Sequence, residues 1–190
     1  MNKNYDWLIT LIKIVGSGMP GSAPFLQALS EVESKEIKER LSKLEDPISN
    51  LHPDIPALAQ LIYDKLKLEN STGLEFNDKF YQEYSKSLAV LEANNYIKQK
   101  KTLGQRYPSG IYVADPFFIM YLCSIAEDEK KMDSLIELVE NCEFGKWLDG
   151  KKIQLDLPLP VIRAVFKIYE SKGYGICSNE TGTCKYLCKS

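Results

Sequence analysis

The sequence predicts a mainly helical α+β fold in which small antiparallel hairpins accompany amphipathic helices. Apolar residues recur at the three- and four-residue spacing of helix faces over most of the chain. Two shorter segments, near residues 96–113 and 174–188, have the strand, polar loop and strand pattern of hairpins. The 190 residues, 44% of them apolar, are enough to bury the core of one substantial domain or two small ones.

The first 55 residues are expected to form an N-terminal helical segment. An apolar run at 5–15 ends in the sequence GSGMPG at 16–21, whose three glycines and one proline break a helix. This turn lacks the lysine and the glycine spacing of phosphate-binding loops, so we expect a connection between packed helices. A second helix is predicted over 22–45, because an apolar stripe runs along it opposite a charged face.

Residues 56–125 are predicted to form a central unit. A helix over 57–68 precedes a turn and a short strand. The stretch 77–115 then begins with Asn77, a favourable helix N-cap, and continues with apolar residues at helical spacing. A basic loop follows, and the chain returns as the strand-like sequence Gly-Ile-Tyr-Val at 110–113. The order is therefore helix, strand, loop and strand.

Residues 126–190 are predicted to form a helical connector followed by a helix and a hairpin. The preceding segment 117–125 is apolar on all sides, as a buried helix should be. An amphipathic helix over 161–173 ends in glycine, as helices commonly do. Because a hairpin follows it, this region partly echoes the central unit, and a second such unit is the alternative to a simple extension.

The net charge of -2 does not by itself indicate a nucleic acid or a membrane as partner, but the charge is unevenly distributed along the chain. Residues 126–149 hold eight acids and three lysines, a balance of -5, whereas residues 151–190 hold seven bases and three acids, a balance of +4. Such asymmetry can place a basic face on an acidic protein. No secretory signal and no apolar run of about 20 residues is visible, so we expect no membrane span. The odd count of five cysteines then favours a reducing cytoplasm.

Three cysteines, Cys177, Cys184 and Cys188, fall in the C-terminal hairpin. If residues 179–182 form its turn, Cys177 and Cys184 lie opposite each other, with Cβ atoms about 4.5–5.5 Å apart. A disulfide needs the closer kind of pair, and a zinc site would have only three ligands without a CxxC motif. We expect structural thiols and no metal or other cofactor, while free, bridged and metal-bound states stay open.

The chain offers little for catalysis. His52 is the single histidine, it lies in a proline-rich connection, and a surface or capping role is the simpler interpretation. No nucleophile motif accompanies it. We therefore expect no catalytic residues and no enzyme.

The sequence LEANNYIK at 91–98, with the basic loop after it and Ile-Tyr-Val at 111–113, resembles the third helix and wing of winged-helix (winged helix-turn-helix) proteins. The likeness covers residues 57–122, and Asn95 stands where the family often has a left-handed glycine. Because most members are DNA-binding transcription regulators, the resemblance implies binding of double-stranded DNA, as a homodimer on paired half-sites. The candidate contacts in the recognition helix and wing are Lys86, Asn94, Lys98, Lys100, Lys101 and Arg106. The alternative is that these lysines only keep an edge hairpin soluble.

A fainter likeness concerns residues 24–30 and 51–66, which look like segments of bacterial abortive-infection (phage-defence) proteins. This likeness implies a second hypothesis, a non-catalytic protein–protein interaction module. Such a module would use the N-terminal half or the acidic segment 126–149 against a protein partner. We prefer the DNA-binding hypothesis.

Overall fold

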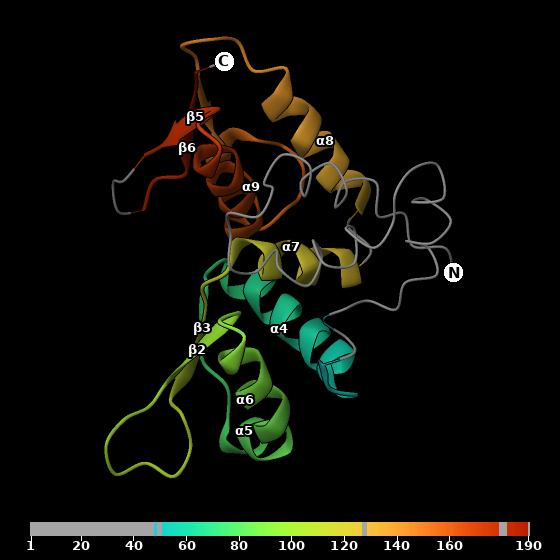
Figure 1. Ribbon diagram of the computed structural model, residues 1–190, viewed down its shortest axis with the longest axis vertical. Coiled ribbons are helices and arrows are strands. Elements are labelled where there is room, and N and C mark those ends of the chain that lie inside the picture. Colours follow the sequence, from blue (N-terminus) through green and yellow to red (C-terminus); the bar gives the residue numbers. More distant parts are fainter. Residues whose placement is uncertain (1–47, 49–50, 127–128, 179–181, 190) are drawn as a thin grey trace.

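The computed structural model describes residues 48, 51–126, 129–178 and 182–189 (Figure 1). The apolar run at 5–15, the glycine-rich turn and the helix predicted over 22–45 lie outside the described residues, as does the tip of the second hairpin. The described part is α+β, with six α-helices and two three-stranded antiparallel sheets. None of its helices is long and apolar enough to cross a membrane.

The first half of the described chain has one small sheet beside three helices. Its elements are α4 (Ile55–Glu69), β1 (Gly73–Leu74), α5 (Asp78–Glu83), α6 (Ser85–Ala93), β2 (Ile97–Lys100) and β3 (Gly110–Val113). The strands pair antiparallel in the order β1-β3-β2. Asn77 caps α5 as expected, since its side chain accepts the backbone N–H of Phe80 at 3.0 Å.

The helix predicted to run on from Asn77 is broken at Tyr84 into α5 and α6. The Tyr84 N–H bonds to the Phe80 carbonyl, and the Tyr84 carbonyl accepts the N–H of Leu88, so one residue ends one helix and starts the next. The break allows Phe80 in the short helix and Leu88 in the longer one to be buried in the same core. Helical spacing within either piece gave no sign of this change of direction.

The second half has the same kinds of element. They are α8 (Glu129–Glu140), β4 (Trp147–Asp149), the 3₁₀ turn η4 (Gly150–Lys152), α9 (Leu159–Ser171), β5 (Gly175–Cys177) and β6 (Lys185–Cys188). The strand order is β4-β6-β5, so again the first strand pairs with the third and the third with the second. The sequence analysis did not predict strand β4, which pairs with β6 and makes the second sheet three-stranded like the first.

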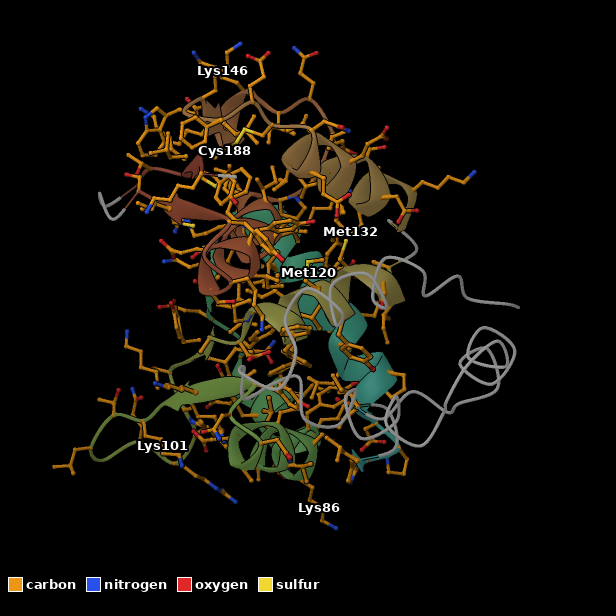
Figure 2. The ribbon with its side chains drawn as sticks, turned by 45° about the horizontal axis from the view of Figure 1, so that its top comes forward. Lys86, Lys101, Met120, Met132, Lys146 and Cys188 are labelled. Carbon is orange, nitrogen blue, oxygen red and sulfur yellow. A yellow bond between two sulfur atoms is a disulfide. The ribbon has the colours of Figure 1, made fainter. Side chains whose placement is uncertain are left out.

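Helix α7 (Pro116–Ile125) lies between the two halves (Figure 1). It packs against α4 on one side and α9 on the other, and every residue from Phe117 to Ser124 is buried. Met120 of α7 and Met132 of α8 are both buried (Figure 2). This confirms the prediction of a buried helix from a segment that is apolar on all sides, and the two halves share one apolar core.

The two sheets have the same register. In the first, Tyr112 of β3 stands between Gly73 of β1 and Lys98 of β2. In the second, Leu187 of β6 stands between Trp147 of β4 and Ile176 of β5. In each sheet the residue just before the first strand also accepts the same backbone hydrogen bond. The Val113 N–H donates to the Thr72 carbonyl at 2.9 Å, and the Cys188 N–H donates to the Lys146 carbonyl at 3.1 Å.

The ends of α6 and α9 repeat one another as well. Asn95 and Gly173 both adopt the left-handed conformation, with φ of 62° and 83°. The next residue then bonds back over the helix end, Tyr96 N–H to the Leu91 carbonyl at 3.0 Å and Tyr174 N–H to the Tyr169 carbonyl at 3.2 Å. The partial echo seen in the sequence is therefore a repeat of topology, register and helix termination.

The cysteines differ from the prediction. Cys177 lies opposite Tyr186, so the expected opposition of Cys177 and Cys184 is wrong. The Tyr186 ring stacks on Phe166 at 5.2 Å and occupies the space over Gly175, where a Cβ would come within 2.2 Å of it. This packing sets the register.

Cys188 forms a disulfide with Cys142, a pairing that the hairpin pattern does not reveal. Cys123, Cys177 and Cys184 are buried and take no part in a disulfide within the described residues. Burial, then the neighbouring Glu170 carboxylate, raises the pKa of the Cys177 thiol to about 12. The expectation of structural thiols therefore holds for Cys177 and Cys184 and is wrong for Cys188.

Opening the Cys142–Cys188 disulfide is expected to lower the free energy of unfolding by about 4 kcal/mol, because the unfolded chain gains the freedom of the closed loop. The two residues are separated by 46 positions. Urea unfolding of the oxidised protein with and without a reductant measures this difference. In a Cys142→Ser variant the reductant should cause no further decrease; an equal decrease there would contradict the assignment.

Candidate nucleic-acid interface

The β2–β3 hairpin is the most basic surface feature of the first half. Residues 97–113 contain four bases and no acid. The loop between the strands projects away from the helices, at the end of the molecule farthest from α8 (Figure 1). A protruding basic loop is suited to contact with phosphate groups.

The outer face of the hairpin carries the strand lysines. Along β2, Ile97 is buried while Lys98 and Lys100 are exposed, as alternation in a strand requires. Lys98 stands beside Tyr112, whose side chain is 50% exposed. Among the described residues, neither lysine has a carboxylate within ion-pair distance. Arg106 lies over the ring of Tyr107, with 5.3 Å between guanidinium carbon and ring centre, a contact that leaves its charge unpaired within the described chain.

Glu92 at the end of α6 holds the base of this hairpin. One carboxylate oxygen accepts the backbone N–H of Gln99 and the other accepts its side-chain amide, both at 2.8 Å. Lys101 approaches the same carboxylate at 3.5 Å. Burial acts to raise the pKa of Glu92, but the hydrogen bonds from Gln99 and the charge of Lys101 outweigh it, so the pKa lies below its ordinary value. Of the predicted contacts, Lys101 is therefore the one already paired with an acid.

The second half repeats this arrangement. Glu170 accepts the backbone N–H of Cys177 at 2.7 Å and the ammonium of Lys167 at 2.8 Å. Burial acts to raise the pKa of Glu170, and its bonds from Lys167 and Cys177 more than offset that, so this pKa is also lowered. In both halves the glutamate precedes its N–H donor by seven residues. This shared spacing is the sequence signal that could have identified the two carboxylates as hairpin supports.

Lys86 and Asn94 lie at opposite ends of α6, and both are exposed. Asn94 is the C-cap, and its amide donates to the Val90 carbonyl at 2.9 Å, so this donor is engaged with its own helix. Lys86, in the first turn, extends outward from the same end of the molecule as Lys101 (Figure 2). The structure thus places all six predicted residues on the surface of α6 and the hairpin. Of the five bases among them, Lys86, Lys98, Lys100 and Arg106 have no ion pair in the described chain, whereas Lys101 is paired with Glu92.

The second hairpin does not continue the basic surface. Residues 175–188 hold one acid and one lysine, so their charges cancel. Arg163 on α9 donates to the Thr183 carbonyl at 2.5 Å, and Lys167 is paired with Glu170. The bases of α9 therefore support their own hairpin, and the candidate interface lies in the first half alone.

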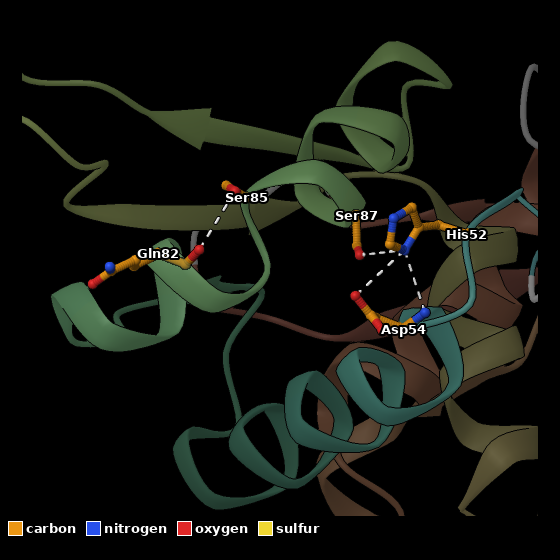
Figure 3. Close-up of polar contacts among 5 residues, drawn as sticks. All are labelled: His52, Asp54, Gln82, Ser85 and Ser87. Atoms are coloured by element: carbon orange, nitrogen blue, oxygen red, sulfur yellow. Dashed lines mark hydrogen bonds and ion pairs between the residues drawn. The ribbon is translucent and has the colours of Figure 1, made fainter.

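His52 takes part in a serine–histidine–aspartate contact (Figure 3). Its Nδ1 atom lies 2.9 Å from Ser87 Oγ and 3.5 Å from an Asp54 carboxylate oxygen, and it accepts the Asp54 backbone N–H at 3.3 Å. A catalytic relay needs the hydroxyl and the carboxylate on different ring nitrogens. Here both are at Nδ1 and Ser87 is fully buried, so the contact fastens the start of α4 to α6.

In the described part of the chain, no three histidine, cysteine or acidic side chains gather in a way that could hold a metal ion. Comparisons with protein-family models, with curated proteins and with solved structures found no match to this chain. The likenesses to winged-helix and to abortive-infection proteins therefore stay predictions.

Because Glu92 and Glu170 have lowered pKa values, the free energy of unfolding should decrease at acidic pH. A carboxyl whose pKa is lowered by folding stabilises the protein above its ordinary pKa, here 4.5, and this stabilisation disappears as the pH falls through the lower folded value. The wild type should lose more unfolding free energy between about pH 5 and 3 than a Glu92→Gln/Glu170→Gln variant. Urea unfolding at each pH measures this, with Glu83→Gln as a control for an exposed carboxylate. Equal acid sensitivity of the wild type and the double variant would refute it.

Proposed function

We propose that the chain is a non-catalytic DNA-binding protein built from two winged-helix units, of which the first contacts double-stranded DNA. The observation that carries the proposal is the β2–β3 hairpin, a protruding loop and strand pair with four bases, no acid and three bases that have no ion pair in the described chain. The element order from α4 to β3 and the strand order β1-β3-β2 support the winged-helix assignment.

The hairpin would bind mainly through phosphate groups. Lysine and arginine side chains neutralise phosphates and release condensed counterions, which favours binding and makes it sensitive to salt. The exposed face of α6 carries Ala89 and Ala93 and few groups able to hydrogen bond to bases. Lys86 is the side chain best placed to extend this contact along the helix. Affinity would therefore depend on the hairpin, while sequence preference would be modest.

In this proposal the protein acts as a transcription regulator, and a homodimer would read paired half-sites. The second candidate is a protein–protein interaction module. A specific observation favours it: the second sheet exposes apolar side chains where the first exposes a lysine. The two candidates are compatible, because they use different halves of the chain.

The DNA-binding proposal predicts that affinity for a random duplex falls steeply with salt. Changing Lys98, Lys100, Lys101 and Arg106 to alanine should abolish most binding. The slope of log affinity against log salt should also decrease by about one for each phosphate group that the variant no longer neutralises. Fluorescence anisotropy at several salt concentrations measures both quantities.

The matched control removes four positive charges elsewhere, from Lys130, Lys151, Lys152 and Lys172, and should leave the salt slope nearly unchanged. Circular dichroism confirms that each variant is folded. If the folded wild type binds no duplex at low salt, or both quadruple variants bind equally poorly, the hairpin is not a DNA-contacting surface.

A further inference from the structure

The outer face of the second sheet has an apolar central row, next to a charged pair in which Asp149 stands opposite Lys185. Its central row consists of Trp147, Leu187 and Ile176, whose counterparts in the first sheet are Gly73, Tyr112 and Lys98. Trp147 is 53% exposed and Ile176 is 37% exposed. One scaffold thus carries a basic surface in the first half and an apolar one in the second.

Exposed apolar side chains gather around this row. The described part of the chain exposes nine large apolar side chains, and five of them lie in α8, β4, β5 or the loops beside these elements. These five are Leu138, Phe144, Trp147, Tyr174 and Ile176. Leu138 and Trp147 line the same hollow. Exposed apolar side chains with aromatic members, concentrated in one region, are typical of a protein–protein interface.

The face is flanked by charges of both signs. Lys185 and Lys189 are exposed on either side of Leu187 in and just after β6. On the other side, α8 and the residues after it carry four acids and no base between 133 and 143. Glu140 accepts the Tyr169 hydroxyl and Glu143 is paired with Lys146, so Glu137 is the acid that carries the charge argument. A hollow of about 520 Å³ joins the two regions, lined among others by Glu137 and Leu138 of α8 and by Trp147 of β4.

We propose that a second copy of this chain docks on this surface, with the acidic α8 face of each protomer against the lysine-flanked sheet face of its partner. A two-fold interface makes every contact twice, so it requires one patch that is complementary to itself. Two observations join the parts of this surface. Trp147 of the sheet lines one hollow with Glu137 and Leu138 of α8, and Trp147 also stands opposite Leu187, which the exposed Lys185 and Lys189 flank. Leu138 and Trp147 would be buried at its centre. This inference does not rest on DNA binding, since it concerns the other half of the chain.

The oligomeric state of the full chain without DNA tests the proposal. Sedimentation velocity over a concentration series should show a dimer whose dissociation constant rises at least about 100-fold in Trp147→Lys and in Ile176→Lys, because each substitution acts twice per dimer. The control is Leu68→Lys, which alters a side chain that is 81% exposed on α4, and its dissociation constant should match the wild type. Thermal unfolding shows whether Trp147→Lys and Ile176→Lys are folded. If one of them is not, the dissociation constant of the other tests the proposal.

A charge exchange tests the orientation of the partners. Lys185→Glu with Lys189→Glu should weaken the dimer, and adding Glu137→Lys should restore part of its affinity. A monomeric wild type at every concentration, or a dimer that Trp147→Lys and Ile176→Lys leave intact, overturns the proposal. A dimer that Glu137→Lys does not restore overturns the proposed pairing of α8 with the sheet. None of these outcomes depends on the DNA experiment, which measures the first hairpin.

Discussion

Burial of α7 on all sides is the constraint on which the rest of the structure depends. A ten-residue helix that is apolar on every face cannot be covered by a single neighbour, and here α4 and α9 cover it from two sides. Polar contacts then fix how the halves meet. Asn70 at the end of α4 accepts the N–H of Leu159 at 2.7 Å, and Asp156 binds Lys67 of α4 and Lys131 of α8. The two sheets are thereby attached to one core while their outer faces stay available.

Where local chemistry decides a feature, the sequence was sufficient to predict it. The Asn77 cap, the left-handed residues Asn95 and Gly173, and the buried α7 each depend on a few neighbouring residues. Both hairpins were also anticipated, because alternating strands around polar loops are visible in one dimension. The six residues proposed for DNA contact are indeed exposed, as charged and amide side chains on strands and helix faces usually are.

The features that sequence patterns missed depend on distant partners. Strand β4 has only three residues and exists because β6 supplies its hydrogen bonds. The register at Cys177 follows from the packing of Tyr186 on Phe166 and Gly175, and the Cys142–Cys188 pair spans most of the second half. The role of Glu92 was likewise invisible, because its partner Gln99 lies beyond a turn that reverses the chain. Spacing within one segment cannot reveal such contacts, although a comparison of the two halves can.

The Cys142–Cys188 disulfide encloses β4, α9, β5 and β6 in one covalent ring. A protease that cuts the backbone once within this ring cannot release a fragment, because the sulfur link still connects both sides of the cut. The nicked chain would keep its full mass under oxidising conditions and separate into two pieces only after reduction. A cut within the first sheet would leave its two sides without a covalent link, because residues 73–113 contain no cysteine.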